Sequence, residues 1–74
     1  MSEPREVAIR GRMIRLGQLL QLADLADGGG EAKALLGSVP VAVNGEPEAR
    51  RGRQLLVGDV VSVGADELRI VALR

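Results

Sequence analysis

The apolar side chains of this chain are all aliphatic or methionine, and this restricts how it can fold more than any other feature. Its 74 residues include no Phe, Trp, Tyr, Cys or His. A hydrophobic core must therefore be built from Val, Leu, Ile and Ala, with two Met. Because a chain this short supports only one core, we expect residues 1–74 to form a single domain.

The same absences restrict the chemistry. Without cysteine the chain has no disulfide, no thiolate nucleophile and no cysteine-based metal site. Without histidine it has no side chain that ordinarily titrates near neutral pH. Its only hydroxyl side chains are Ser2, Ser38 and Ser62. We therefore expect no enzyme activity, no cofactor and no metal. The lack of aromatic rings also removes the usual platform for stacking unpaired bases.

The apolar runs bear on the location of the protein. The longest of them fall far short of the roughly 20 residues that span a bilayer. The first four residues (MSEP) have no hydrophobic signal region. We expect a cytoplasmic protein with no membrane partner.

Charge is segregated along the chain although its formal net value is zero. Residues 1–15 carry a net +2, residues 16–49 a net −4, residues 50–58 a net +3 and residues 59–74 a net −1. All cations except Lys33 are arginine, which favours bidentate phosphate recognition. A coding preference for arginine over lysine would give the same ratio.

Two helices are indicated in the first half of the chain. A strand pattern at Val7 and Ile9 ends at Gly11, and a helical period follows it. The first helical face comprises Leu16, Leu19, Leu20 and Ala23. Residues 24–30, with three consecutive glycines, break this helix. Residues 31–36 indicate a second helix with Gly37 as its C-cap, and its inward residues are Ala32, Leu35 and Leu36.

The second half reads as short strands separated by turns. Val41 and Val43 precede Asn44-Gly45, the strongest short hairpin signal, and Gly58-Asp59 marks another turn. The remaining alternating apolar residues are Leu55, Val57, Val61, Val63, Leu68 and Ile70. We predict an α+β fold in which two short helices pack on a small, mostly antiparallel sheet. Leu19, Leu35, Val43 and Val61 should meet in one cluster.

Two motifs invite a catalytic or nucleotide-binding interpretation. The glycines of residues 28–30 precede Lys33, but the spacing of a phosphate-binding loop is not met and no Ser or Thr follows the lysine. A turn between helices explains them more simply. Glu46 and Glu48 stand two residues apart without a general-acid partner, so we do not expect a catalytic pair.

The densest basic cluster is the run Arg50-Arg51-Gly52-Arg53. Such a run is usually a solvated face, and three arginines alone do not identify a nucleic-acid site. The order of the motifs is more informative. Residues 14–16, 32–36, 41–45, the arginine run and 56–61 (LVGDVV) resemble the alpha-L RNA-binding domain of the small-subunit ribosomal protein S-four. The chain is most similar to the stand-alone YaaA/YbcJ-like bacterial members, over residues 12–63 without a gap.

The resemblance implies an RNA-binding surface formed by the first helix, the start of the second helix and the loop after the hairpin. The matching positions here are Arg15, Lys33, Asn44, Arg50, Arg51 and Arg53. Many members have Ser-Arg where this chain has Gly28-Gly29, so a helix N-cap and one phosphate-binding arginine are missing.

The expected function follows from this resemblance. We expect binding to the backbone of structured RNA, with ribosomal RNA or a ribosome assembly intermediate as the ligand. If Arg15, Lys33 and the three arginines of the run neutralise about four or five phosphates, log K should fall with log salt at a slope of roughly −3 to −4. Two alternatives stay open, a small protein-protein adaptor without RNA contact and a catalytic accessory.

Overall fold

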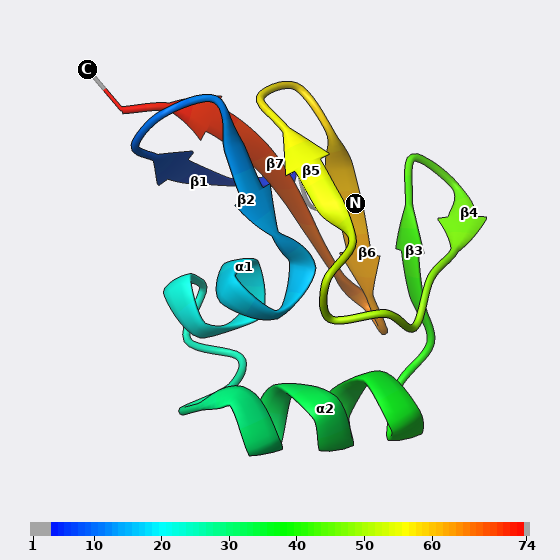
Figure 1. Ribbon diagram of the computed structural model, residues 1–74. Helices are drawn as coiled ribbons and strands as arrows, with labels where there is room; N and C mark the ends of the chain where they lie inside the picture. Colours follow the sequence, from blue (N-terminus) through cyan, green and yellow to red (C-terminus); the bar gives the residue numbers. More distant parts are fainter. Residues whose placement is uncertain (1–3, 74) are drawn as a thin grey trace.

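Two short helices pack beneath a β-sheet in the computed structural model, which describes residues 4–73 (Figure 1). The helices are α1 (Leu16–Leu22) and α2 (Gly29–Ser38). The strands are β1 (Arg5–Ile9), β2 (Met13–Arg15), β3 (Val41–Val43), β4 (Glu46–Pro47), β5 (Gln54–Leu56), β6 (Val60–Val63) and β7 (Asp66–Ala72). The predicted α+β class is confirmed. Both helices of the described residues are too short to cross a bilayer.

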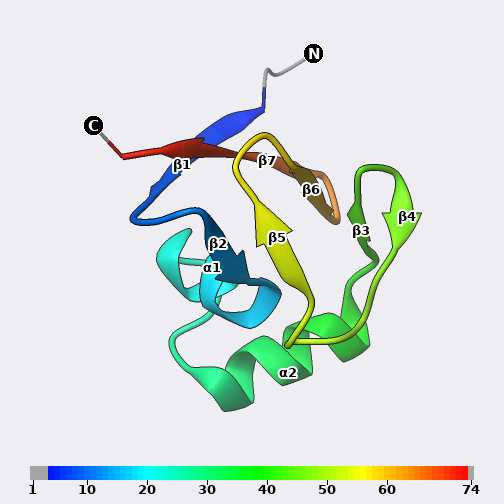
Figure 2. The ribbon, with the colours of Figure 1, turned by 45° about the horizontal axis from the view of Figure 1, so that its top comes forward.

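The main sheet has the strand order β1-β7-β6-β3-β4. Neighbouring strands in this sheet are antiparallel, except that β1 and β7 are parallel. This pair places the first strand beside the last. A second, two-stranded sheet pairs β2 with β5, and Figures 1 and 2 both show these strands side by side. The mostly antiparallel sheet was predicted, but the parallel edge pair and the second sheet were not.

Helix α1 has the predicted apolar face. Leu16, Leu19, Leu20 and Ala23 are all at most 1% exposed. The helix follows β2 without an intervening loop, because Arg15 ends the strand and is also the N-cap residue in extended conformation. Strand β2 therefore fixes where α1 begins.

Helix α2 is longer than predicted. It begins at Gly29 and contains Gly37, so the prediction that Gly37 caps the helix is wrong. Gly29 and Gly30 therefore form its first turn instead of the break that the glycines predicted. At the other end, the Ser38 hydroxyl donates to the Ala34 carbonyl at 2.9 Å. Val39 then takes an extended conformation (φ −120°, ψ 135°), as a residue before proline prefers.

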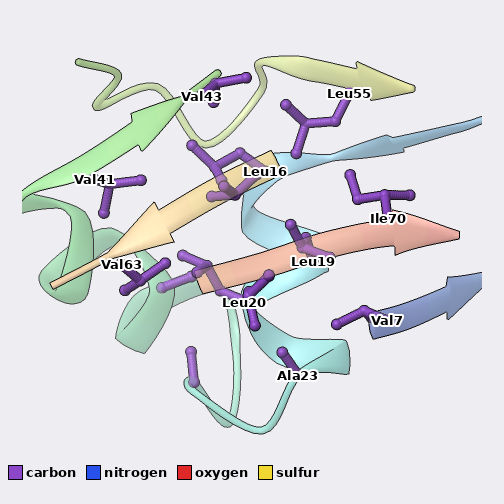
Figure 3. Close-up of a cluster of buried hydrophobic side chains, with 14 of the residues drawn as sticks. Val7, Leu16, Leu19, Leu20, Ala23, Val41, Val43, Leu55, Val63 and Ile70 are labelled. Carbon is purple, nitrogen blue, oxygen red and sulfur yellow. The ribbon is translucent and has the colours of Figure 1, made fainter. Parts of the chain in front are cut away.

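The core lies between the helices and the sheets (Figure 3). Leu19, Val43 and Val61 are at most 1% exposed and belong to one cluster, as predicted. Leu35 is only partly buried and packs against this cluster, whereas Ala32 and Leu36 are buried. The inward face of α2 is thus set by an i, i+4 pair, with Leu35 at its margin.

Candidate nucleic-acid interface

The loop between β4 and β5 is held against the start of α1. The Leu16 N–H donates to the Arg53 carbonyl and the Gly17 N–H to the Arg51 carbonyl, both at 2.9 Å. The first N–H groups of a helix have no partner within it, so these bonds satisfy two of them. The Arg15 N–H is likewise bonded, to Gln18 Oε1 at 3.1 Å. The arginine loop and the helix start therefore form one local unit.

Arg51 connects the two helices. Its Nη1 donates to the Gly29 carbonyl in the first turn of α2 at 3.1 Å. Its side-chain stem lies on Gly17 of α1, where an added Cβ would come within 3.3 Å of the Arg51 Cβ. Gly17 is buried, so the missing side chain is what allows the loop to approach this closely.

A shallow hollow of about 320 Å³ opens beside Arg51. Its lining includes Arg15 and Arg51, the glutamines Gln18 and Gln21, and no carboxylate among the described residues. Lys33 is exposed and stands four residues after Gly29, which places it on the same face of α2 one turn further along. Two of the sequence-predicted residues, Arg15 and Arg51, thus line one hollow, and Lys33 follows on α2 outside its lining.

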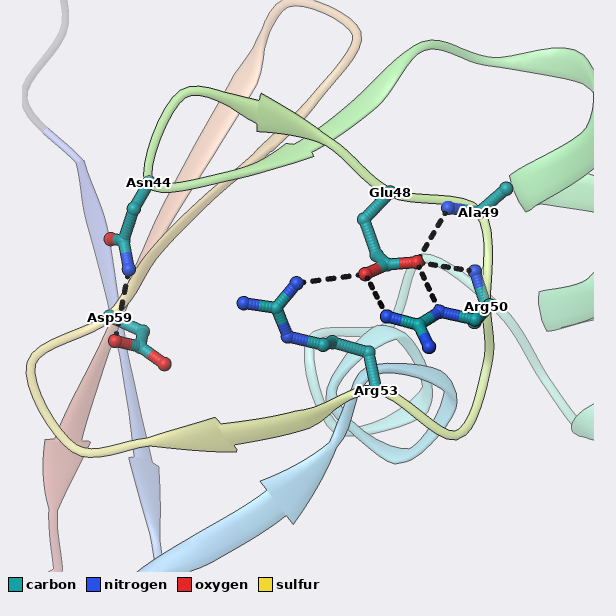
Figure 4. Close-up of polar contacts among 6 residues, drawn as sticks. All are labelled: Asn44, Glu48, Ala49, Arg50, Arg53 and Asp59. Carbon is teal, nitrogen blue, oxygen red and sulfur yellow. Dashed lines mark hydrogen bonds and ion pairs between the residues drawn. The ribbon is translucent and has the colours of Figure 1, made fainter.

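The other two arginines of the run are bound by Glu48 (Figure 4). The Arg50 Nε and Nη2 donate to the Glu48 carboxylate at 3.0 and 3.1 Å, and Arg53 Nη1 donates to it at 2.8 Å. The backbone N–H groups of Ala49 and Arg50 donate to the same carboxylate at 3.1 Å. The Glu48 side chain is only 7% exposed, whereas that of Arg50 is 76% exposed.

This clamp of Glu48, Arg50 and Arg53 changes the charge of the loop. Hydrogen bonds from Arg50 and Arg53 hold the pKa of Glu48 well below its usual range, so the carboxylate is ionised at neutral pH. The same contact with Glu48 raises the pKa of Arg50. Arg51, in contrast, has no carboxylate within 4.0 Å among residues 4–73. The charge that residues 50–58 show in the sequence is therefore partly offset by an acid just before them.

Asn44 lies elsewhere. It occupies the β3–β4 turn, where Asn44 and Gly45 have φ values of +50° and +87°, as the Asn-Gly signal predicts. Its Nδ2 donates to Asp59 Oδ1 at 3.1 Å, and its Oδ1 accepts the Val60 N–H at 2.9 Å. Figure 4 shows Asn44 and Asp59 apart from the clamp. The structure thus gives Asn44 the task of joining the hairpin to β6.

Gly28 and Gly29 stand where many alpha-L domains have Ser-Arg. Gly28 is the N-cap residue of α2 and makes no side-chain cap, as its identity requires. A Cβ at Gly29 would lie 3.4 Å from the Arg51 Nη1. The guanidinium of Arg51 therefore lies beside the position from which the family's arginine would extend.

Two glutamines of this surface were not among the candidates from sequence. Gln18 and Gln21 line the hollow from the exposed side of α1. The helical period identifies them as outward-facing, but nothing in the sequence separates them from ordinary solvated residues.

Comparison with known proteins gives two matches. The family model described as "S4 domain" matches residues 7–71. A curated relative from Bacillus subtilis, named "Probable ribosome maturation protein RlbA", is 53% identical over 63 residues. That alignment covers 85% of this chain and 86% of the relative. The matched segment includes both helices and every strand except the ends of β1 and β7.

Proposed function

The chain belongs to the S4 domain family, and we propose on this basis that it binds the sugar-phosphate backbone of structured RNA. The proposed contacts are Arg15, Lys33 and Arg51. The name of the Bacillus relative supports ribosomal RNA, or a ribosome assembly intermediate, as the ligand. The proposal assigns no reaction to the chain.

The observation that carries the proposal is the hollow beside Arg51. Two guanidinium groups border it, a lysine lies on the adjoining face of α2, and its described lining contains no carboxylate. Guanidinium groups match the geometry of phosphate oxygens and can donate to two of them at once. In this proposal Arg50 and Arg53 hold the loop through Glu48, and Asn44 holds the hairpin.

The test is the salt dependence of binding to a ribosomal RNA hairpin between 50 and 300 mM KCl. Three phosphate contacts predict a slope of log K against log salt of about −2 to −3. The double variant Arg15→Gln, Lys33→Gln should lose about 1.5 to 2 units of this slope. The matched control is Arg5→Gln with Arg69→Gln, which removes the same charge from β1 and β7.

Two results would contradict the proposal. One is an affinity that does not change with salt, and the other is a larger loss of slope in the control pair than in the Arg15, Lys33 pair. Absence of RNA binding together with retained folding would favour the protein-protein adaptor.

A further inference from the structure

A second hollow, of about 530 Å³, opens between the end of β1, strand β2 and the exposed side of α1. Its walls include Met13, Ile14 and Leu22, and Arg10 lies at the same opening. Met13 is 41% exposed and Leu22 is 51% exposed, so large apolar side chains face solvent here. The phosphate proposal does not use this apolar hollow.

The apolar hollow adjoins the hollow beside Arg51. Gln18 and Gln21 line both of them. These two residues lie three apart on α1, and Leu22 lies four after Gln18, so all three share one helix face. Together the two linings contain Arg10, Arg15 and Arg51 and no carboxylate among the described residues. They are two parts of one basic surface.

We propose that the apolar hollow receives a single unstacked nucleobase of the same RNA strand whose phosphates contact Arg15 and Arg51. The inference rests on the proposed function and names the RNA feature that the surface recognises, a bulged nucleotide beside a paired stem. Unstacked bases in bulges are the parts of structured RNA that proteins read most readily.

The lining has the groups that such a base requires. Apolar side chains can enclose an extruded base, and the thioether of Met13 makes favourable contacts with aromatic rings. The Gln21 amide has no hydrogen-bond partner among residues 4–73, and only the Oε1 of Gln18 is used, by the Arg15 N–H. Glutamine amides pair with base edges, most often with adenine. This chain has no aromatic residue, so Met13 and Leu22 take the place of a stacking platform.

A protein partner could also use an apolar hollow. The shared glutamines and the carboxylate-free lining favour RNA, because a base in this hollow would lie next to the arginines that the phosphates of its own strand contact. If a base occupies the hollow, RNA binding should depend on its apolar residues, and if a protein occupies it, RNA binding should not.

The experiment compares RNA hairpins of identical stem with and without a one-nucleotide bulge, each of the four bases being placed there in turn. The parent should bind the best bulged hairpin about tenfold more tightly than the paired one. Met13→Ala with Leu22→Ala should remove most of this preference and leave the salt slope unchanged. Val57→Ala is the matched control, because Val57 is 44% exposed and lines a different hollow. Circular dichroism checks that each variant is folded.

The outcomes separate the inference from the proposed function. Equal binding of bulged and paired hairpins with a slope of about −2 to −3 overturns the inference and leaves the phosphate contacts standing. A preference that survives in the double variant also overturns it, because the bulged base would then be recognised elsewhere on the surface. No RNA binding by the parent overturns both. If the double variant does not fold, Gln21→Leu is the second test, and an unchanged bulge preference there counts against the inference.

Discussion

Arg51 and its neighbours Arg50 and Arg53 are one run in the sequence but belong to two regions of the molecule. Arg50 and Arg53 donate to Glu48, which they share. Arg51 extends the other way, across Gly17 to the Gly29 carbonyl, and no carboxylate of residues 4–73 lies within 4.0 Å of it. Two of the three cations thus share one carboxylate, and in the proposed function Arg51 is the one that contacts a phosphate.

The difference shows that a basic run does not by itself describe a basic surface. Glu48 stands only two residues before Arg50, and a division of the sequence at residue 50 assigns it to the acidic segment. In the folded loop its carboxylate accepts hydrogen bonds from both arginines and from two backbone N–H groups. The short contacts with Glu48 determine the local charge more than the net charge of the sequence segment does, because ionic interactions weaken with distance and are screened by salt.

The position of Arg51 depends on Gly17, because the Arg51 stem packs against it. Replacement of Gly17 should therefore have the largest effect on stability and binding. Gly17→Val should destabilise the protein by about 1–3 kcal/mol more than Gly37→Val, because the added atoms meet the Arg51 stem and overpack the site. Gly37 is the matched control, since it is also helical and a Cβ there meets nothing within 4 Å. Chemical denaturation measures both.

Gly17→Val should also weaken RNA binding by displacing Arg51, while Gly37→Val should leave it unchanged. If the two variants prove equally stable, the close approach of the loop to α1 is not as described.

A smaller effect is expected from removing the acid of the clamp. Glu48→Gln should steepen the salt slope by about one to two units, because it frees two arginines for phosphates. It should also change the pH dependence of stability. Folding depresses the pKa of Glu48 below its usual value of about 4.5. The contribution of this carboxylate to folding stability is therefore complete above that pH and is lost progressively below it.

Thermal melts of the parent and of Glu48→Gln from pH 8 to pH 3 test whether stability falls with pH in this direction. The difference between their melting temperatures should be constant down to about pH 5 and smaller at pH 3. A difference that is the same at pH 6 and pH 3 would show that the ionised carboxylate does not hold the loop.

Local signals in the sequence predicted much of the fold. The helical period of α1 is confirmed by four residues that are at most 1% exposed, and the Asn-Gly signal by two positive φ values in the turn. Pairings between distant segments were not predictable in the same way. Short strands such as Met13–Arg15 carry too few residues to reveal their partner, and the parallel contact of β1 with β7 joins the two ends of the chain.

The candidate site was predictable only in part. Resemblance to the alpha-L family selected six residues, and of these the structure places Arg15 and Arg51 at one hollow, with Lys33 exposed on α2 one turn beyond Gly29. Arg50 and Arg53 are held by Glu48, and Asn44 by Asp59 and Val60. A long side chain can reach several neighbours. The folded loop, rather than residue spacing, therefore determines that Arg51 donates to the Gly29 carbonyl and Arg53 to Glu48.

The most direct test compares the salt slopes of Arg51→Gln and of the double variant Arg50→Gln, Arg53→Gln on one ribosomal RNA hairpin. Arg51→Gln should weaken binding about tenfold at 100 mM salt and reduce the slope by about 0.7 to 0.9, the loss of one phosphate contact. The double variant removes twice the charge but should leave the slope unchanged, because those arginines contact Glu48. A larger loss of slope in the double variant than in Arg51→Gln would contradict the division of the arginine run into a structural and a binding part.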